Sequence, residues 1–268
     1  MTLKDAIDLL SKAGIEDAAY DARELFCEIG GIDRSKLVFL DTVCDSETLA
    51  EAIERRMNRE PLQYIIGHVD FYRERYKVTP DALIPRSDTE ILVDHAVRHI
   101  PCGESFLDLC TGSGCVAVSV LKNTHSTKAV AIDISPAAAA LAEHNAKKNG
   151  VKDRLNVIVA DVSSFIAEEK YFAILSNPPY VEEEVYKELA PEIFFEPKLA
   201  FTADDRGLAF YRIILDRYAE HLKPNGFFAF EIGYDQANRI SLLARERGMQ
   251  CEIIKDLSGC DRVAVIRK

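Results

Sequence analysis

The sequence has no uninterrupted apolar run of the roughly 18 residues that a membrane-spanning helix requires. It also has no internal repeats and no low-complexity tracts. The first residues include Lys4, Asp5, Asp8 and Lys12, which interrupt the apolar core that a secretory signal needs. We therefore expect a cytoplasmic globular protein, and 268 residues suffice for one large domain accompanied by a small one.

Paired cysteines are also missing. No C-x-x-C motif occurs, and no histidine lies at metal-binding spacing from a cysteine, although the chain has seven cysteines. An odd number of thiols without such pairs is typical of a reducing compartment. We expect reduced thiols and no metal site at the seven positions, which are Cys27, Cys44, Cys102, Cys110, Cys115, Cys251 and Cys260.

Positive charge is in deficit. The chain has 33 Lys and Arg residues against 44 Asp and Glu residues, a formal net charge of −11. Because proteins that bind duplex DNA usually present a basic face, this balance argues mildly against a stable nucleic-acid partner. It mildly favours a basic protein partner. We expect a monomer with neither a nucleic-acid partner nor a membrane partner.

The first 70 residues carry helical signals and no chemical motif. Thr2-Leu3-Lys4-Asp5 has the pattern of a capping box, and apolar residues then recur on one helical face. A second amphipathic stretch spans Ala18–Ile29, and a third runs from Ser46 to about Arg59. Up to Arg75 the chain is acidic, with 10 Lys and Arg residues against 16 Asp and Glu residues. We interpret residues 1–70 as a small helical domain that recognises a substrate.

Residues 71–85 change to a strand pattern, which predicts a β-hairpin linker. The turn signal is Thr79-Pro80-Asp81. The residues that favour short strands are Phe71, Tyr72, Tyr76 and Val78.

Residues 86–268 alternate between strand and helix signals. Such alternation is typical of an α/β domain in which helices cover both faces of a mostly parallel sheet. The last two candidate strands lie close together in the chain, which indicates an antiparallel edge on a seven-stranded sheet. The predicted strands are Ser105–Leu109, Lys128–Asp133, Leu155–Ala160, Phe172–Ser176, Phe227–Ile232, Glu252–Lys255 and Arg262–Arg267.

A glycine-rich turn follows the first strand of this domain, in the segment Asp108-Leu109-Cys110-Thr111-Gly112-Ser113-Gly114. Glycines at a strand-to-helix turn let the backbone approach a ligand closely. Ligands of open α/β sheets bind beyond the carboxyl ends of the strands. Asp133 ends the second strand, where a carboxylate can accept hydrogen bonds from both hydroxyls of a ribose. This pattern predicts a ligand that contains adenosine.

A dinucleotide site competes with this interpretation. Gly112-Ser113-Gly114-Cys115-Val116-Ala117 also fits G-x-G-x-x-G/A, and Asp133 lies 21 residues after Gly112, as that fingerprint expects. Two features favour S-adenosylmethionine instead. Asp108 precedes the glycines, where it can meet the cationic end of a methionine moiety, and the fourth strand ends in an acceptor motif.

That acceptor motif is Asn177-Pro178-Pro179-Tyr180. An amide nitrogen, like the exocyclic amine of adenine, is a poor nucleophile because its lone pair is delocalised. The Asn177 side-chain oxygen and the Pro178 carbonyl can each accept one N–H and favour a pyramidal nitrogen. The two prolines stiffen the turn, and Tyr180 offers a flat face. Methyl transfer then requires mainly in-line positioning and no metal.

Further stretches resemble the release factor glutamine methyltransferase family of HemK/PrmC type. The resemblance covers the chain from about Arg59 to the C-terminus. Besides the glycine turn and the Asn-Pro-Pro-Tyr motif, the matching stretches are Arg59–Gly67, Leu83–Glu90, Asp133–Pro136, Glu196-Pro197, Gly207-Leu208, Glu231–Gly233 and Asp256–Gly259.

The resemblance implies a Rossmann-like S-adenosylmethionine-dependent methyltransferase fold. It also implies methylation of the side-chain amide of the glutamine in the Gly-Gly-Gln motif of peptide chain release factors, which would be the protein partners. The glutamine would be held by Asn177, Pro178, Pro179 and Tyr180, with Asn177, Pro178 and Tyr180 as the catalytic residues. S-adenosylmethionine, leaving as S-adenosylhomocysteine, would be held by Asp108, Cys110, Thr111, Gly112, Ser113, Gly114, Asp133, Ile134, Asp161, Val162 and Asn177.

The sequence departs from the family at three of these positions. Val162 stands where many members have an aromatic residue, Cys110 stands where glycine is usual, and Ser87 stands where proline is usual. Arg86, Asp88, Thr89 and Glu90 also fit a plain helix start, capped by Ser87 or Asp88. Glu196-Pro197 also fits an ordinary loop.

Three other functions compete with glutamine methylation. An adenine methyltransferase shares the acceptor motif, but the chain shows no separate basic domain to read bases. A nicotinamide-dependent dehydrogenase needs a proton-transfer residue, and none is apparent in this chain. A binding module without catalysis does not account for a cofactor turn and an acceptor turn in one chain.

Overall fold

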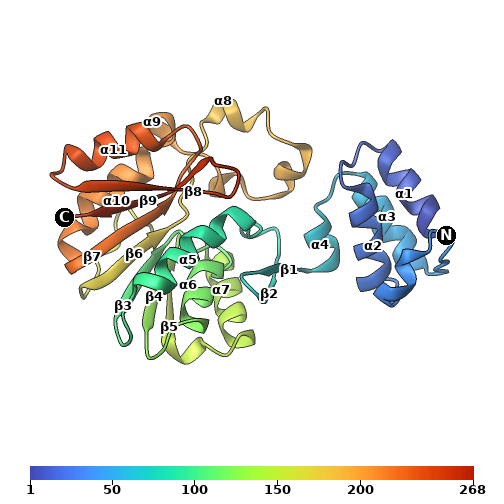
Figure 1. Ribbon diagram of the computed structural model, residues 1–268, viewed down its shortest axis with the longest axis horizontal. Helices are drawn as coiled ribbons and strands as arrows, with labels where there is room; N and C mark the ends of the chain where they lie inside the picture. The colour runs from blue at the N-terminus through green and yellow to red at the C-terminus, as the bar shows by residue number, and fades with distance from the viewer. The chain divides into compact units, whose positions relative to one another are not determined.

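The structure, a computed structural model, describes residues 1–268. The chain forms two compact units (Figure 1). One unit comprises Met1–His68 together with the segment Ala190–Phe195. The other comprises Val69–Leu189 and Glu196–Lys268. We call them the helical unit and the sheet unit. No helix in the chain has the length and apolar character needed to cross a membrane.

The helical unit is built from amphipathic helices, as the sequence predicts. The expected capping box is confirmed, because the Thr2 hydroxyl accepts from the Asp5 N–H and the Asp5 carboxylate accepts from the Thr2 N–H. Two elements were not predicted from the sequence, the short helix α4 and a 3₁₀ turn at Arg34–Val38. The helices are α1 (Leu3–Lys12), α2 (Ala18–Glu28), α3 (Glu47–Met57) and α4 (Leu62–Ile66).

A hairpin begins the sheet unit. Its strands are β1 (His68–Phe71) and β2 (Glu74–Lys77), so Tyr72 and Val78 lie outside the strands that the sequence predicts. The hairpin turn is formed by Tyr72 and Arg73, both at positive φ, and the signal at Thr79–Asp81 marks a separate turn. The hairpin is packed into the sheet unit, since Tyr76 is fully buried and its hydroxyl lies 2.6 Å from that of Ser119.

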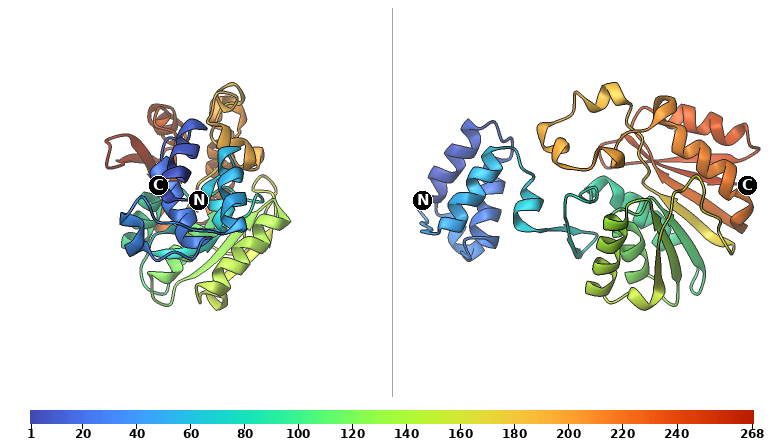
Figure 2. Two further views of the ribbon diagram at one scale, coloured as in Figure 1. Left: turned by 90° about the vertical axis from the view of Figure 1, so that its right-hand side faces the viewer. Right: turned by 180° about the vertical axis from the view of Figure 1, so that it is seen from behind.

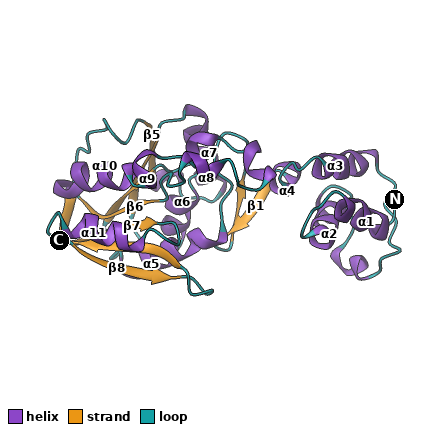
Figure 3. Ribbon diagram, turned by 90° about the horizontal axis from the view of Figure 1, so that it is seen from above, coloured by secondary structure: helices purple, strands orange, loops and turns teal.

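Seven strands form one sheet in the order β5-β4-β3-β6-β7-β9-β8. Figure 3 shows strands of this sheet in orange with helices beside them. Strands β3 to β7 are parallel, and β9 runs antiparallel between β7 and β8. The predicted mostly parallel sheet with an antiparallel edge is therefore confirmed. The strands are β3 (Ser105–Leu109), β4 (Lys128–Asp133), β5 (Leu155–Val159), β6 (Tyr171–Ser176), β7 (Leu222–Glu231), β8 (Gln250–Lys255) and β9 (Asp261–Arg267).

Helices cover both faces of this sheet (Figures 1 and 2). Neighbouring residues of β3 point to opposite sides, so Phe106 packs with α5, α6 and α7 while Leu107 packs with α10 and α11. The long strand β7 starts at Leu222, whereas the sequence predicts a start at Phe227. The first part of the strand is missed because Pro224-Asn225-Gly226 has the sequence pattern of a turn. The helices are α5 (Glu90–His99), α6 (Cys115–Lys122), α7 (Pro136–Lys148), α8 (Glu183–Tyr186), α9 (Asp204–Gly207), α10 (Ala209–Tyr218) and α11 (Ala237–Arg245).

Candidate functional site

A cavity of about 390 Å³ opens in the sheet unit at the carboxyl ends of the parallel strands. Cys110 follows β3, Asp133 ends β4, Asp161 follows β5 and Asn177 follows β6, and all four line the cavity. Strands β4 and β6 flank β3 on opposite sides, so the chain order reverses there. Ligands of open α/β sheets bind at this kind of switch point. The size lies within the range usual for small-molecule sites.

The glycine turn after β3 depends on left-handed backbone. Cys110, Gly112 and Gly114 have φ of 60°, 54° and 78°. Gly112 and Gly114 nevertheless have different roles. Gly112 lines the cavity, and a Cβ added there would meet only the Ala82 Cβ, at 4.0 Å. A Cβ on Gly114 would lie 2.9 Å from the Ala142 Cβ, so Gly114 lets α6 pack against α7 and does not line the cavity.

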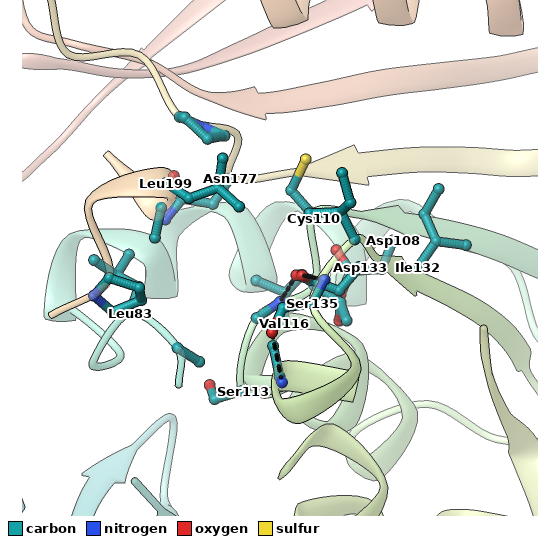
Figure 4. Close-up of a pocket in the computed structure, with 18 of the residues that line it drawn as sticks. Leu83, Asp108, Cys110, Ser113, Val116, Ile132, Asp133, Ser135, Asn177 and Leu199 are labelled. Carbon is teal, nitrogen blue, oxygen red and sulfur yellow. Dashed lines mark hydrogen bonds between the residues drawn. The ribbon is translucent and has the colours of Figure 1, made fainter. Parts of the chain in front are cut away.

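Asp133 is tied to the same turn. Its carboxylate accepts from the Gly112 N–H at 2.8 Å and from the Ser135 N–H at 2.9 Å (Figure 4). Each carboxylate oxygen retains a lone pair for a ligand hydroxyl. Ser135 also caps α7, with Pro136 in its first turn, as the sequence predicts. Burial raises the pKa of Asp133, and the two backbone N–H groups act against that rise.

Asp108 is the most deeply buried acid of the cavity wall. It is 1% exposed, and its carboxylate accepts from the Thr111 hydroxyl at 2.6 Å. Burial raises the pKa of Asp108 to about 7. A cationic ligand group in the cavity would favour its ionised form.

Apolar side chains form the remaining wall. Val162 and Ile134 line the cavity as predicted, and Val162 is buried. Leu83, from the matching stretch Leu83–Glu90, lines it as well, as do Leu199 and Phe210, which no local sequence signal marks. Figure 4 shows Leu199 and Asn177 on one side and Asp133 and Ser113 on the other. The other lining residues are Asp81, Ala82, Pro85, Arg86, Thr89, Thr111, Cys115, Val116, Ile132, Ser135, Ala138, Ala160, Pro179, Pro197 and Ala200.

The acceptor turn Asn177–Tyr180 is held by several partners. Its last residue pairs with a later segment, since the Tyr180 N–H donates to the Phe201 carbonyl at 3.1 Å. The Tyr180 carbonyl accepts from Gln236 Nε2 at 3.1 Å, and a Cβ on Gly207 would collide with that carbonyl. Asn177 and Pro179 line the cavity, whereas Pro178 and Tyr180 do not.

A buried hydrogen-bond network lies behind the acceptor turn. Asn177 Nδ2 donates to Thr89 Oγ1 at 3.3 Å, and Thr89 Oγ1 donates to Glu231 Oε2 at 2.5 Å. The Tyr180 hydroxyl donates to the other oxygen of Glu231 at 3.3 Å. Burial raises the pKa of Glu231 to about 7, and Arg262 opposes that rise. Thr89 and Glu231 lie in stretches that match the family, but their contact with each other and with Asn177 was not evident from the sequence, because the three residues lie far apart in the chain.

The segment Arg86–Glu90 is not the simple capped helix start that its residues also fit. A 3₁₀ turn at Ser87–Thr89 leads into α5, and neither Ser87 nor Asp88 caps it. The capping expectation is wrong because these polar groups have other partners: Asp88 pairs with Arg262 at 3.1 Å, and the Thr89 hydroxyl donates to Glu231. Glu90 accepts from the Tyr72 N–H at 2.8 Å.

Glu196 is likewise more than part of an ordinary loop. It is 4% exposed, accepts from the Ile84 N–H at 2.8 Å and pairs with Arg86. Pro197, Leu199 and Ala200 follow it and line the cavity. Glu196 therefore ties one wall of the cavity to the segment that precedes α5.

Known proteins resemble the chain over nearly all of its length. The family described as Methyltransferase small domain matches residues 87–202, and the PrmC N-terminal domain matches residues 2–67. A release factor glutamine methyltransferase of Geobacter sulfurreducens is 35% identical over 95% of this chain and 91% of its own. That of Thermodesulfovibrio yellowstonii is 37% identical over 92% of both chains.

Solved structures agree on the fold. A methyltransferase of Pyrococcus furiosus superimposes with a TM-score of 0.54 over 71% of this chain and 86% of its own, at 18% identity. That identity supports the sheet and helix arrangement alone, whereas the two relatives above are similar enough to establish kinship. The chain belongs to the release factor glutamine methyltransferase family.

Proposed function

We propose that this enzyme transfers a methyl group from S-adenosylmethionine to the glutamine side-chain amide of the Gly-Gly-Gln motif in peptide chain release factors. The observation that carries the proposal is the placement of Asn177 at the wall of the cavity that the glycine turn and Asp133 also line. The names of the relatives, release factor glutamine methyltransferase, point to the same substrate.

The residues of the cavity fit S-adenosylmethionine. Asp133 would accept from the ribose hydroxyls, and Asp108 would face the methionine end. The Ser113 hydroxyl is buried in the cavity wall without a hydrogen-bond partner, so a polar ligand group there would satisfy it. The apolar side chains Val162, Leu199 and Phe210 suit a purine.

When bound, the cofactor supplies an electrophilic methyl group on a sulfonium. The protein must then present an amide nitrogen with its lone pair directed at that methyl group. Asn177 lines the cavity and its Oδ1 accepts no hydrogen bond within the protein, so this oxygen is available to one N–H of the substrate amide. The Pro178 carbonyl accepts no hydrogen bond either, and we assign the second N–H to it, although Pro178 does not line the cavity. Holding both N–H groups reduces the conjugation of the nitrogen, and the methylated nitrogen then loses its extra proton to water.

We further propose that the helical unit recognises the release factor. The unit has no residue in the cavity, its chain is acidic, and it exposes an apolar patch made by Val38, Phe39, Leu40 and Val43. Exposed apolar groups of this kind mark interaction surfaces. Phe39 is 65% exposed and is the only aromatic residue of the patch.

The substrate assignment is tested with labelled S-adenosylmethionine and three acceptors: a purified release factor, the same factor with its Gly-Gly-Gln glutamine replaced by alanine, and adenine-containing DNA and RNA. We expect label only in the first. Label in nucleic acid and none in the release factor would contradict this proposal. That result would indicate adenine methylation instead, because the turn Asn177–Tyr180 also suits the amine of adenine.

The role of the helical unit is tested with Phe39→Asp in the full chain. We expect KM for the intact release factor to rise about tenfold, with kcat and cofactor affinity unchanged, because an interface anchor is lost. Tyr234→Asp is a matched control, since Tyr234 is a similarly exposed aromatic of the sheet unit. Equal KM values for Phe39→Asp and the parent would remove the patch from the substrate interface.

A further inference from the structure

We propose that Thr89 and Glu231 are positioning residues, which hold the Asn177 amide with its oxygen directed at the acceptor nitrogen. The proposal rests on the proposed glutamine methylation and deepens it. Thr89 immediately precedes α5, Glu231 ends β7 and Asn177 follows β6. The three side chains therefore come from distant parts of the sheet unit.

The hydroxyl of Thr89 has a single hydrogen to donate. Thr89 Oγ1 is buried between two partners, Glu231 Oε2 at 2.5 Å and Asn177 Nδ2 at 3.3 Å. Above about pH 7 Glu231 is ionised, and an ionised carboxylate can only accept hydrogen bonds. The Thr89 hydrogen is therefore committed to Glu231, and only oxygen lone pairs remain for Asn177.

The orientation of Asn177 follows from that commitment. An asparagine side chain has an NH₂ face and an oxygen face of nearly the same shape, and only its partners decide which way each points. Because Thr89 offers only lone pairs, the NH₂ of Asn177 must face it. The oxygen then points away from Thr89, where it can accept from the substrate amide.

The same carboxylate also holds the far end of the acceptor turn. The Tyr180 hydroxyl donates to Glu231 Oε1 at 3.3 Å. Glu231 thus accepts from two hydroxyls, and each fixes one end of Asn177–Tyr180. Glu231 faces charged groups as well, Arg262 of β9 and Asp88 beside Thr89, and Arg262 pairs with Asp88 and Asp256 at 3.1 Å each. Glutamine at position 231 could accept from one hydroxyl only.

The test uses Thr89→Val and Thr89→Ser in the full enzyme. Valine keeps the shape of threonine and removes the hydroxyl, whereas serine retains it. We expect Thr89→Val to slow single-turnover methylation of a release factor about 10- to 100-fold, with unchanged KM and cofactor affinity. Thr89→Ser should recover most of the rate, and Glu231→Gln should lie between Thr89→Val and the parent.

A matched control and a double variant separate positioning from general damage. Thr124 is buried, and its hydroxyl donates to the Val120 carbonyl at 2.7 Å, away from the cavity. Thr124→Val should therefore leave the rate unchanged. If Thr89 acts through Asn177, adding Thr89→Val to Asn177→Ala should slow the reaction no further. A full additional loss in that background, or a parental rate for Thr89→Val, would overturn the proposal.

A spectroscopic measurement tests the proposal without methylation. The side-chain NH₂ signals of Asn177 are identified by their loss in Asn177→Asp. We expect Thr89→Val to shift these signals while backbone signals of β6 remain in place. Unchanged NH₂ signals would refute the positioning role even in an active enzyme. Shifted signals in an enzyme that fails to methylate release factors would leave the positioning role supported and the substrate assignment wrong.

Discussion

The two turns that line the cavity are held in different ways. The glycine turn keeps its shape through left-handed backbone and through Asp133, which accepts from the Gly112 N–H. The acceptor turn is stiffened by its two prolines and is held in place by Thr89, Glu231 and Gln236, which come from distant segments. The residues of both turns can be recognised in the sequence, whereas the distant partners that hold the acceptor turn become visible only in the fold.

The largest effect should come from the acceptor turn. We expect Asn177→Ala to lower single-turnover methylation about 100- to 1,000-fold while cofactor affinity stays near that of the parent. Asn177→Asp should retain more activity than Ala and less than the parent, because it keeps an acceptor oxygen but cannot donate to Thr89. A parental single-turnover rate for Asn177→Ala would exclude this turn from the acceptor site.

The next effect separates the two glycines of the first turn. Gly114→Ala forces a Cβ against Ala142 at left-handed φ, and we expect it to lower the free energy of unfolding by about 2–5 kcal/mol. Gly112→Ala has open space and should cost about 1–2 kcal/mol. Gly112→Ala should in turn weaken cofactor binding more, since its Cβ enters the cavity. Urea unfolding and calorimetry measure both, and the reverse ranking would contradict this division of roles.

A smaller effect is expected at Asp133. Replacing it with alanine removes the acceptor for the ribose and the acceptor for the Gly112 N–H. We expect S-adenosylmethionine binding to weaken by about 1–3 kcal/mol in calorimetry. Retained affinity for S-adenosylmethionine, or preferential binding of a nicotinamide dinucleotide by the parent, would contradict the assigned ribose contact.

An effect of similar size concerns the pH dependence of stability. Burial raises the pKa of Glu231 from its ordinary value of 4.5 to about 7. Its contribution to stability is therefore complete below pH 4.5 and is lost as pH rises through about 7. Between pH 5 and pH 8 the stability of Glu231→Gln should improve relative to the parent by about 1–3 kcal/mol. Urea unfolding of both proteins at pH 5 and at pH 8 measures this difference. A difference that does not change with pH would show that Glu231 is not the group that titrates.

Much of the fold was predictable because its signals are local. The strands Ser105–Leu109 and Lys128–Asp133 match the predicted bounds, since each is a short apolar run with a clear end. The hairpin turn at Tyr72-Arg73 was missed because neither residue is typical of positive φ. Leu222, the true start of β7, was missed because a turn-like Pro-Asn-Gly follows it.

The candidate site was predictable to a similar extent. The positions after β3, β4 and β6 follow from strand ends and turns, so Gly112, Asp133 and Asn177 were found. The partners behind them depend on tertiary contacts between distant segments. Thr89 fits a helix start and Glu231 fits the end of a strand, and only their meeting in the fold reveals a shared network.

The helical unit is discontinuous along the chain, and this limits how it can be excised. Arg56 is 7% exposed and pairs with Asp21 at 2.7 Å and with Glu192 at 3.0 Å, and Arg59 also pairs with Glu192. A fragment ending at His68 would keep the pair between Arg56 and Asp21 but would omit Glu192, the carboxylate that Arg56 and Arg59 share. Removing one partner from a buried charge network destabilises a protein. The helical unit therefore cannot be isolated intact with a single cut in the gene, and a grafted version must carry residues 190–195 as a second piece.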